Sequence, residues 1–162
     1  MASAIRKLCA DRPNADLLAE PGDVTDADAA QAIIDDLGAV DILVNNLGIF
    51  DATPALEMKD VEWRCYFDAN VLSAARLTRL VLPDMMKRSG ERVLNVTSDS
   101  AVVIPQDMIH YGVSKTAVLA LSRGHAKEAA GTGVTVNSVI AGPAHTGDVE
   151  DFVYELVDPN LP

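Results

Sequence analysis

The sequence is poor in cysteine and in aromatic residues, and it contains no long apolar run. Its 162 residues include only two cysteines, Cys9 and Cys65, whose separation fits neither a metal-binding cluster nor a disulfide framework. We expect both to be reduced thiols in a cytoplasmic protein. No apolar run approaches the ~18 residues that cross a membrane, and no signal-peptide pattern opens the chain. We therefore expect neither a membrane span nor a disulfide framework in this sequence.

Basic residues are also scarce, because 13 Lys and Arg stand against 24 Asp and Glu and the formal net charge is −11. Such a surface repels phosphates, which argues against a nucleic acid or an anionic membrane as partner. The three histidines share no metal-ligand spacing, and the acids between residues 23 and 28 lack the glycine and the final glutamate of a calcium loop. We expect no metal site. His110 is expected at the surface by default, and the alternative is that it lines a substrate entrance.

The apolar residues alternate between strand-like runs and helical spacing over most of the chain. A nearly continuous apolar run predicts a buried strand over residues 40–45, and further strands are predicted over 91–97 and 134–140. Apolar residues at three- and four-residue steps predict a long helix over 59–87 and another over 114–130. This order predicts a single α/β domain over 1–162, with a parallel sheet and helices on both faces.

Weaker signals lie towards the two ends. Residues 3–10 and the stretch after Glu150 have short helical patterns, and residues 16–20 form a short apolar strand candidate. A helix is expected to begin near Thr25, where Thr25 and Asp28 resemble a capping box, and to end at Gly38.

Polar residues follow three of the predicted strands. Asn45 and Asn46 end the first of these strands, Ser98 ends the second, and Asn137 with Gly142 accompanies the third. Because the carboxyl ends of parallel strands lie along one edge of a sheet, these residues are expected to converge there. The convergence predicts a ligand site at that edge.

Tyr111 and Lys115 stand four residues apart, so on a helix both side chains leave from one face. A lysine ammonium held beside a phenol favours the phenolate, and a serine such as Ser98 is able to hold a substrate oxygen. The pattern indicates a proton relay for carbonyl or alcohol chemistry. Asn70 interrupts the apolar stripe of the long helix, and a buried amide there is either a satisfied structural group or is held for chemistry.

Taken in order, these motifs resemble the short-chain dehydrogenase/reductase family over nearly the whole chain. The segment Asn45-Asn46-Leu47-Gly48 resembles the family's Asn-Asn-Ala-Gly, and Ser98 precedes Tyr111 by the family's thirteen residues. The other matching positions are Asn70 in the long helix, Asp23-Val24, and the segment from Val136 through Gly142 to Thr146.

The resemblance implies a role for each matching residue. Tyr111 would be the general acid/base, Ser98 would bind the substrate oxygen, and Lys115 would assist Tyr111 and bond the nicotinamide ribose. Asn70 would hold a water that extends the relay. The implied cofactor is NAD or NADP, which the sequence does not distinguish. Its contacts would be Asp23, Val24, Asn45, Asn46, Gly48, Tyr111, Lys115, Gly142 and Thr146.

The resemblance also implies that this chain is short at both ends. No glycine-rich turn precedes Asp23, so we expect a partial doubly wound, Rossmann-like sheet without the family's first two strands. The strand near Leu17 would then lack a neighbour, and the strand near Ile42 would be an exposed apolar edge. The implied function is an NAD(P)-dependent oxidoreductase acting on a small carbonyl or alcohol substrate. The alternative is an inactive fragment or interaction module. In both cases the chain is expected to form a homodimer or homotetramer through the two long helices.

Overall fold

The structure is a computed structural model, and it describes residue 10 and residues 14–143. The helix expected over residues 3–10 lies almost wholly outside the described residues, as do Thr146 and the helical stretch expected after Glu150.

The described chain contains a three-stranded parallel sheet in the order β1-β2-β3. The strands are β1 (Ile42–Asn45), β2 (Arg92–Ser98) and β3 (Thr135–Ala141), each within two residues of its predicted start. The strand expected over 16–20 is not formed. Those residues have no regular secondary structure, and Leu18 is 70% exposed, because no neighbouring strand offers it hydrogen-bond partners.

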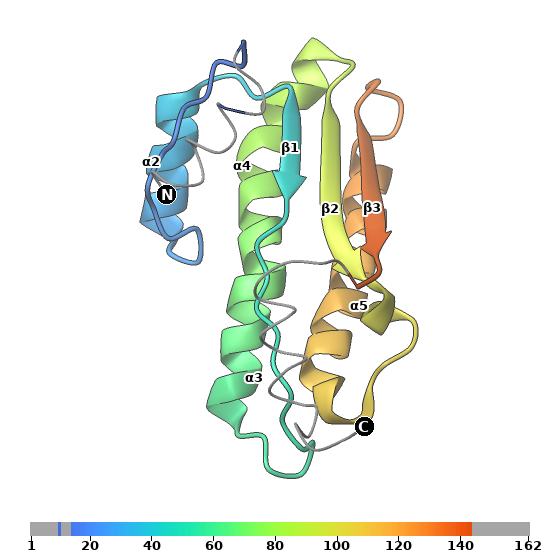
Figure 1. Ribbon diagram of the computed structural model, residues 1–162. Helices are drawn as coiled ribbons and strands as arrows, with labels where there is room; N and C mark the ends of the chain where they lie inside the picture. The colour runs from blue at the N-terminus through green and yellow to red at the C-terminus, as the bar shows by residue number, and fades with distance from the viewer. Residues whose placement is uncertain (1–9, 11–13, 144–162) are drawn as a thin grey trace.

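Helices α2 to α5 accompany the sheet in the part of the chain from residue 14 to residue 143 (Figure 1). They are α2 (Ala27–Leu37), α3 (Asp60–Phe67), α4 (Ser73–Arg88) and α5 (Ile109–Glu128). The long helix predicted over 59–87 is confirmed as α3 and α4, which join through a π-helical turn at Asp68–Leu72. Helix α5 begins five residues before its predicted start because the 3₁₀ turn Gln106–Met108 leads directly into it, without a side-chain cap to mark the boundary.

The start of α2 differs from the expected capping box by one residue. Asp26 is the N-cap, and its carboxylate accepts hydrogen bonds from the amides of Asp28 and Ala29. Thr25 instead donates both its amide and its hydroxyl to Asp23. Asp23 thus stabilises the turn before the helix, and Asp26 caps the helix itself.

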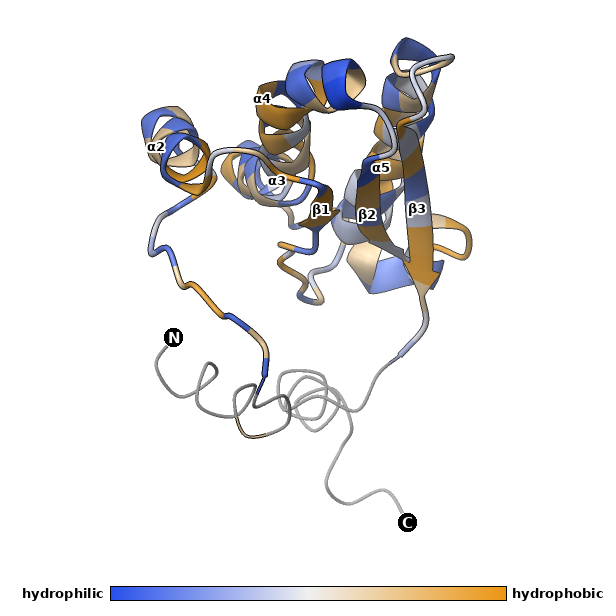
Figure 2. Cartoon of the chain, turned by 90° about the horizontal axis from the view of Figure 1, so that it is seen from above, coloured by the Kyte–Doolittle hydropathy of each residue, from blue (hydrophilic) through white to orange (hydrophobic). Residues whose placement is uncertain are grey.

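Helices α4 and α5 cover the same face of the sheet (Figure 2). Both crossovers step in one direction along the sheet, from β1 to β2 and from β2 to β3, and right-handed crossovers in one direction place their helices on one side. The α/β class and the parallel sheet are confirmed, and the helices of the described chain lie on one face where two covered faces were expected. The core between these layers is built on Val81, Met85, Val93, Ala129 and Val136.

The opposite face of the sheet is apolar and open. Ile42 is 60% exposed and Val44 is 53% exposed, and Val139 of β3 is also exposed. Strand β1 is the edge strand, as expected from the sequence, with a neighbour on one side only. Such an edge is a template for pairing with another chain.

A row of hydrogen-bonded polar side chains crosses the sheet under the helices. Asn45, Asn95 and Ser138 are register partners on the three strands. Asn45 donates to Asn95 at 2.8 Å, and both Asn95 and Ser138 donate to Ser122 of α5 at 2.9 and 2.7 Å. A further bond joins Asn45 to Thr78 of α4 at 3.1 Å. The row ties all three strands to both helices at one level.

None of the described helices has both the length and the apolar character that a membrane span needs.

Candidate active site

Helix α5 places Tyr111 and Lys115 one turn apart at the end of the sheet where the strands terminate. The Lys115 Nζ lies 5.7 Å from the centroid of the Tyr111 ring. Tyr111 is half-buried, and within the described chain no other residue hydrogen-bonds its hydroxyl. The hydroxyl is therefore available to an incoming group.

Lys115 is only 5% exposed, and its ammonium donates to the Val96 carbonyl at 3.2 Å. Burial lowers its pKa, because the charged form loses hydration. Gly48 lies directly against it, since a β-carbon at position 48 would meet Nζ at 2.9 Å. The absence of a side chain at Gly48 therefore leaves room for the Lys115 ammonium at the end of β1.

Asn70 is buried in the π-helical turn, and both polar atoms of its side-chain amide are hydrogen-bonded. Its Oδ1 accepts the Ile49 amide at 2.7 Å, and its Nδ2 donates to the Ile49 carbonyl at 3.0 Å and to Ser114 Oγ at 2.9 Å. Ser114 in turn donates to the Tyr111 carbonyl at 2.7 Å. The amide is thus satisfied, and it also joins the π turn to the helix that carries Tyr111.

Ser98 ends β2 and is nearly buried. Its Oγ donates to Asp99 Oδ1 at 3.0 Å and accepts the Ser100 amide at 3.1 Å. The neighbouring Thr97 hydroxyl donates to the Lys115 carbonyl at 2.9 Å, so it serves strand-to-helix packing. No hydrogen bond joins Ser98 to Tyr111 in the described part of the chain. The Thr97 hydroxyl is thus committed to α5, whereas the partners of the Ser98 hydroxyl lie in the turn that follows β2.

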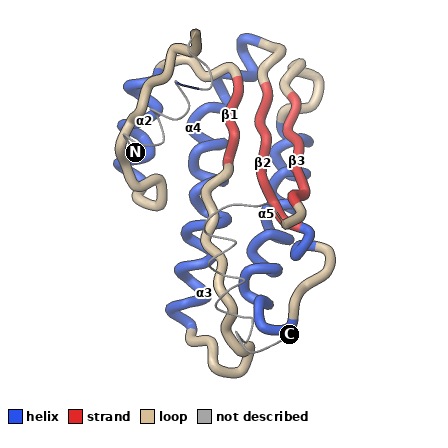
Figure 3. The backbone as a smooth tube through the Cα atoms, viewed as in Figure 1, coloured by secondary structure: helices blue, strands red, loops and turns tan. Residues whose placement is uncertain are grey.

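The segment after β1, residues Gly48–Thr53, forms a strap over this region. Figure 3 shows the loop that follows β1 descending between α3 and α5. Four residues of the strap contact the π turn, helix α5 or the 3₁₀ turn that precedes α5. These are Ile49 with Asn70, Phe50 edge-on to Tyr111 with ring centroids 6.2 Å apart, Asp51 with His110, and Thr53 with the Asp107 carbonyl at 2.7 Å. Sequence reasoning identified only its first residue.

His110 is buried, and the expectation of a surface histidine is wrong. It is 1% exposed, with its ring edge-on to Tyr66 at 4.2 Å between centroids and to Trp63 at 6.3 Å. Trp63 and Tyr66 are three residues apart in α3 and so share a helix face, and this aromatic pair is the sequence signal for an apolar surface that a buried ring can pack against. Burial lowers its pKa, and a hydrogen bond to the Asp51 backbone partly opposes this.

The residues expected to hold a dinucleotide are distributed along the same end of the sheet. Asn46 and Gly48 follow β1 and are exposed, and Gly142 follows β3 and is exposed. The side chain of Asn45 is different, because it lies under the helices in the polar row and its Oδ1 has no partner. Sequence reasoning missed this structural role.

Asp23 and Val24 precede α2 and are not in contact with Tyr111 or Lys115. Hydrogen bonds from Thr25 lower the pKa of the Asp23 carboxyl, and the Val24 carbonyl accepts Arg76 of α4 at 2.8 Å. Figure 1 shows the N-terminal end of α2 at the same end of the molecule as the carboxyl ends of the strands. In sequence, Asp23 and Val24 come just before this end of α2.

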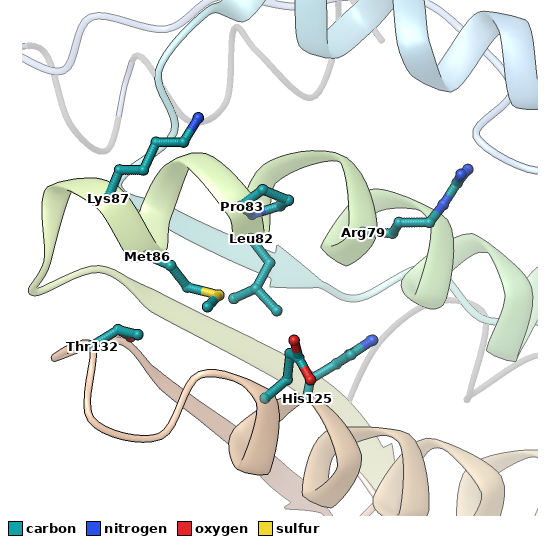
Figure 4. Close-up of a pocket in the computed structure, with 8 residues that line it drawn as sticks. Arg79, Leu82, Pro83, Met86, Lys87, His125 and Thr132 are labelled. Carbon is teal, nitrogen blue, oxygen red and sulfur yellow. The ribbon is translucent and has the colours of Figure 1, made fainter.

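Two hollows lie near these elements. A cleft of about 130 Å³ opens beside the end of β1 and is lined by Asn45, Asn46, Asn70, Ser73 and Val96, among others. A groove of about 500 Å³ lies between α4 and α5, with Leu82, Pro83 and Met86 on one wall and His125 and Thr132 on the other (Figure 4). The groove contains none of the acid/base residues. The described residues also contain no group of three or more metal-ligating side chains.

Comparisons with known proteins give a consistent result. A family model described as short chain dehydrogenase matches residues 1–154. The chain is 42% identical over 134 residues to the uncharacterized oxidoreductase YvrD of Bacillus subtilis, covering 81% of this chain and 51% of that protein. It is 38% identical over 112 residues to the 3-oxoacyl-[acyl-carrier-protein] reductase FabG of Vibrio cholerae, covering 69% of this chain and 46% of that protein.

Solved structures agree with the sequence relatives. A putative short-chain dehydrogenase/reductase from Burkholderia xenovorans superposes with a TM-score of 0.86 at 27% identity, covering 95% of this chain and 64% of that one. The aldohexose dehydrogenase of Thermoplasma acidophilum gives a TM-score of 0.77 at 29% identity, covering 85% of this chain and 56% of that one. The chain spans about half the length of the curated relatives it matches.

Proposed function

The chain belongs to the short-chain dehydrogenase family, and we propose that it is an NAD(P)-dependent oxidoreductase that uses Tyr111 as the acid/base on a carbonyl or alcohol substrate. One observation carries the proposal. The Lys115 ammonium lies 5.7 Å from the Tyr111 ring on the same helix face, while the Tyr111 hydroxyl is left unengaged by other described residues.

In the reducing direction, Tyr111 donates its phenolic proton to the carbonyl oxygen while the carbonyl carbon gains a hydride. The Lys115 ammonium stabilises the phenolate that remains, an effect strengthened by the low exposure of this lysine. The Ser98 hydroxyl, which donates to Asp99 in the free protein, turns to donate to the substrate oxygen. In the oxidising direction the same groups run in reverse, and the Tyr111 phenolate accepts the alcohol proton.

Asn70 is proposed to hold a water that returns a proton to this relay. Its Oδ1 accepts one hydrogen bond from Ile49 and keeps a second lone pair, and the residue lines the cleft of about 130 Å³. That volume exceeds the space that a single water requires. The water would connect the buried amide to solvent at the end of β1.

The residues present fit the nicotinamide end of a dinucleotide. The bare backbone of Gly48 lets the Lys115 ammonium lie against the end of β1, where a β-carbon would displace it, and Asn46 and Gly142 are exposed after β1 and β3. When bound, the nicotinamide supplies or accepts the hydride. Lys115 and Tyr111 would hold its ribose, with Asn46, Gly48 and Gly142 beside them. Asp23, Val24, Asn45 and Thr146 complete the proposed contacts.

The purified chain provides a direct test. We expect NADH or NADPH to bind in a fluorescence titration, and we expect turnover with one member of a panel of carbonyl and alcohol substrates. The panel includes a 3-oxoacyl-[acyl-carrier-protein] and an aldohexose, because the names of two matched proteins specify these classes. The matched control is Tyr111→Phe, which should lose turnover by about 10²-fold or more and weaken nucleotide binding far less, because the other proposed contacts remain. Absence of both nucleotide binding and turnover would show that this chain is an inactive fragment or interaction module.

A second copy of the chain is the proposed partner of the α4–α5 face, which gives a homodimer or homotetramer. The support is the groove of about 500 Å³ with an apolar wall of Leu82, Pro83 and Met86 between the two helices. Light scattering after gel filtration should give at least twice the chain mass. Met86→Glu should shift the mass towards the monomer, whereas Asp36→Lys on α2 should not. A wild-type monomer at all concentrations would contradict the proposal.

A further inference from the structure

His110 adjoins Tyr111 in sequence but faces a different surface of α5. Its ring is enclosed by Tyr66 and Trp63 of α3, both edge-on, with interplanar angles of 85° and 83°. The chain has few aromatic residues, yet four of them, Phe50, Trp63, Tyr66 and Tyr111, lie around this helix turn. A polar ring in such surroundings needs a specific hydrogen bond to offset its loss of hydration.

A hydrogen bond between the His110 ring and the Asp51 backbone raises the pKa of the imidazole, against the lowering by burial. Nε2 is buried without a partner, so Nδ1 is the nitrogen that donates to the Asp51 carbonyl. This geometry fits only the neutral tautomer with its proton on Nδ1, because a second proton on Nε2 would have no acceptor. The imidazole is therefore a fixed donor aimed at one point of the strap.

Asp51 lies at the middle of the strap Gly48–Thr53. Before it, Phe50 contacts the edge of Tyr111 and Gly48 abuts Lys115, and after it Thr53 is fastened to Asp107. The Asp51 side chain is exposed, so the backbone bond to His110 is what anchors this residue to α5. That bond is one of three anchors of the strap, with the Ile49–Asn70 pair before it and the Thr53–Asp107 bond after it. Its loss would leave Asp51 itself unfastened between the other two.

We propose that His110 is a positioning residue, which fastens the strap at Asp51 and thereby holds Phe50 against Tyr111 and Gly48 against Lys115. Its effect on turnover rests on the proposed function, whereas the fastening itself does not. The histidine touches no reacting atom in this role. It sets where the strap lies relative to the two residues that do the acid/base work.

The same arrangement makes the fastening sensitive to acid. The groups that face His110 are Tyr66 and Trp63 from α3, the Asp51 backbone from the strap, and, at longer range, the carboxylates of Asp51 and Glu62. Burial raises the pKa of Tyr66 to about 12, so its hydroxyl stays neutral and offers no counter-charge. A protonated His110 would lack a partner for Nε2, and we expect the strap to loosen as His110 is protonated.

Two substitutions distinguish the effect of the hydrogen-bond donor from the effect of the aromatic ring. His110→Phe keeps an aromatic ring and removes the donor, whereas His110→Asn restores a donor near the Nδ1 position and removes the titration. Hydrogen exchange of the full chain reports on the strap through the amides of Ile49 and Thr53, which are bonded to Asn70 and Asp107. We expect about tenfold faster exchange of both amides in His110→Phe, near wild-type exchange in His110→Asn, and no change at Val93 in the core of β2.

The proposal would be overturned if the Ile49 and Thr53 amides exchanged at the same rate in His110→Phe as in the wild type. It would also be overturned if they exchanged equally fast in His110→Phe and His110→Asn. If a variant fails to fold, a nitrogen NMR spectrum of the wild-type imidazole tests the proposal instead. A proton on Nε2 rather than on Nδ1 would contradict the proposed hydrogen bond to Asp51. Where turnover is measurable, His110→Phe should lower kcat about tenfold, with less effect on nucleotide affinity. If the wild type binds no nucleotide, the proposed function fails, and the exchange result still decides the fastening.

Discussion

Gly48 and Lys115 come from the end of β1 and from α5, and they are in direct contact: a β-carbon on Gly48 would meet Lys115 Nζ at 2.9 Å. Gly48→Ala should displace the lysine head, because the end of a flexible side chain gives way more easily than backbone. We expect a change of less than about 1 kcal/mol in the free energy of unfolding, measured with urea. Turnover should fall by at least tenfold, since a shift of about 1 Å is costly at a reacting centre. Unchanged turnover would contradict the placement of Lys115.

Gly112 gives the matched comparison. A β-carbon there would meet the Ser100 backbone oxygen and the Ile104 side chain, each at 2.8 Å. Backbone cannot turn aside as a lysine head can, so Gly112→Ala should push α5 away from the loop after β2. We expect a loss of about 1–3 kcal/mol in the free energy of unfolding. If Gly112→Ala and Gly48→Ala have the same free energy of unfolding in urea, the loop after β2 does not pack closely on α5 at Gly112.

The polar row across the sheet should be strongly coupled. Asn95 is its centre, because it accepts from Asn45 and donates to Ser122. Asn95→Leu would leave both neighbours short of a partner in a buried layer, at a cost of about 2–3 kcal/mol in the free energy of unfolding. Ser122→Ala removes part of the same network, so the double variant should lose less than the sum of the two single losses. Additive losses in the denaturation cycle would show that the bonds act independently.

Stability should fall as the pH drops below about 6.5. Burial lowers the folded-state pKa of both His110 and His125 below the ordinary value of 6.5. Between each lowered pKa and 6.5 the unfolded chain binds more protons than the folded chain, so the free energy of unfolding rises with pH in that window. Asp23 has a lowered pKa too, but it acts only below 3.8.

Urea denaturation between pH 5 and pH 8 measures this dependence. His125→Gln should make the profile flatter, because it removes one of the two groups, and His110→Asn should remove the other. A double variant that keeps the full wild-type slope would show that other groups are responsible.

Asn70 links the strap to α5, and its removal should act on both. Asn70→Leu would leave the Ile49 amide and carbonyl without partners and would withdraw a hydrogen bond from Ser114. We expect a loss of about 2–4 kcal/mol in the free energy of unfolding and faster hydrogen exchange at Ile49. Asn70→Asp keeps the acceptor for the Ile49 amide and should protect that amide better than leucine does. Equal exchange at Ile49 in the two variants would contradict the assignment of Oδ1 to this bond.

The sheet and the order of its helices were predictable because their signals are local. The apolar runs near Leu43 and Val93 specify strands, and the helical spacing from Trp63 to Met85 specifies a long helix, whatever lies beyond them. The burial of the strand near Leu43 does depend on what lies beyond it, and Ile42 and Val44 are exposed here. The strand near Leu17 shows the limit of this reasoning. Its sequence resembles a strand, but a strand forms only where a neighbour supplies hydrogen bonds.

The candidate site was predictable in its acid/base pair and not in its supports. Tyr111 and Lys115 share one helix face by spacing alone, and Ser98 follows a predicted strand. The strap was not visible, because its fastening relies on backbone groups such as those of Ile49 and Asp51, whose partners are up to about 60 positions away in sequence. The burial of His110 depends likewise on α3 packing beside α5. Long-range contacts of this kind leave no local periodicity.

The π-helical turn at Asp68–Leu72 sets the rotation of α3 relative to α4. A π turn accommodates one residue more than an α turn, so the two halves of the long helix are out of phase with a continuous α-helix. The phase allows α4 to present Val81 and Met85 to the sheet while α3 presents Tyr66 to His110. Without the extra residue, α3 would turn by roughly 100° and carry Tyr66 away from α5. A single inserted position thus lets one helix serve two differently oriented surfaces, the core at one end and the site at the other.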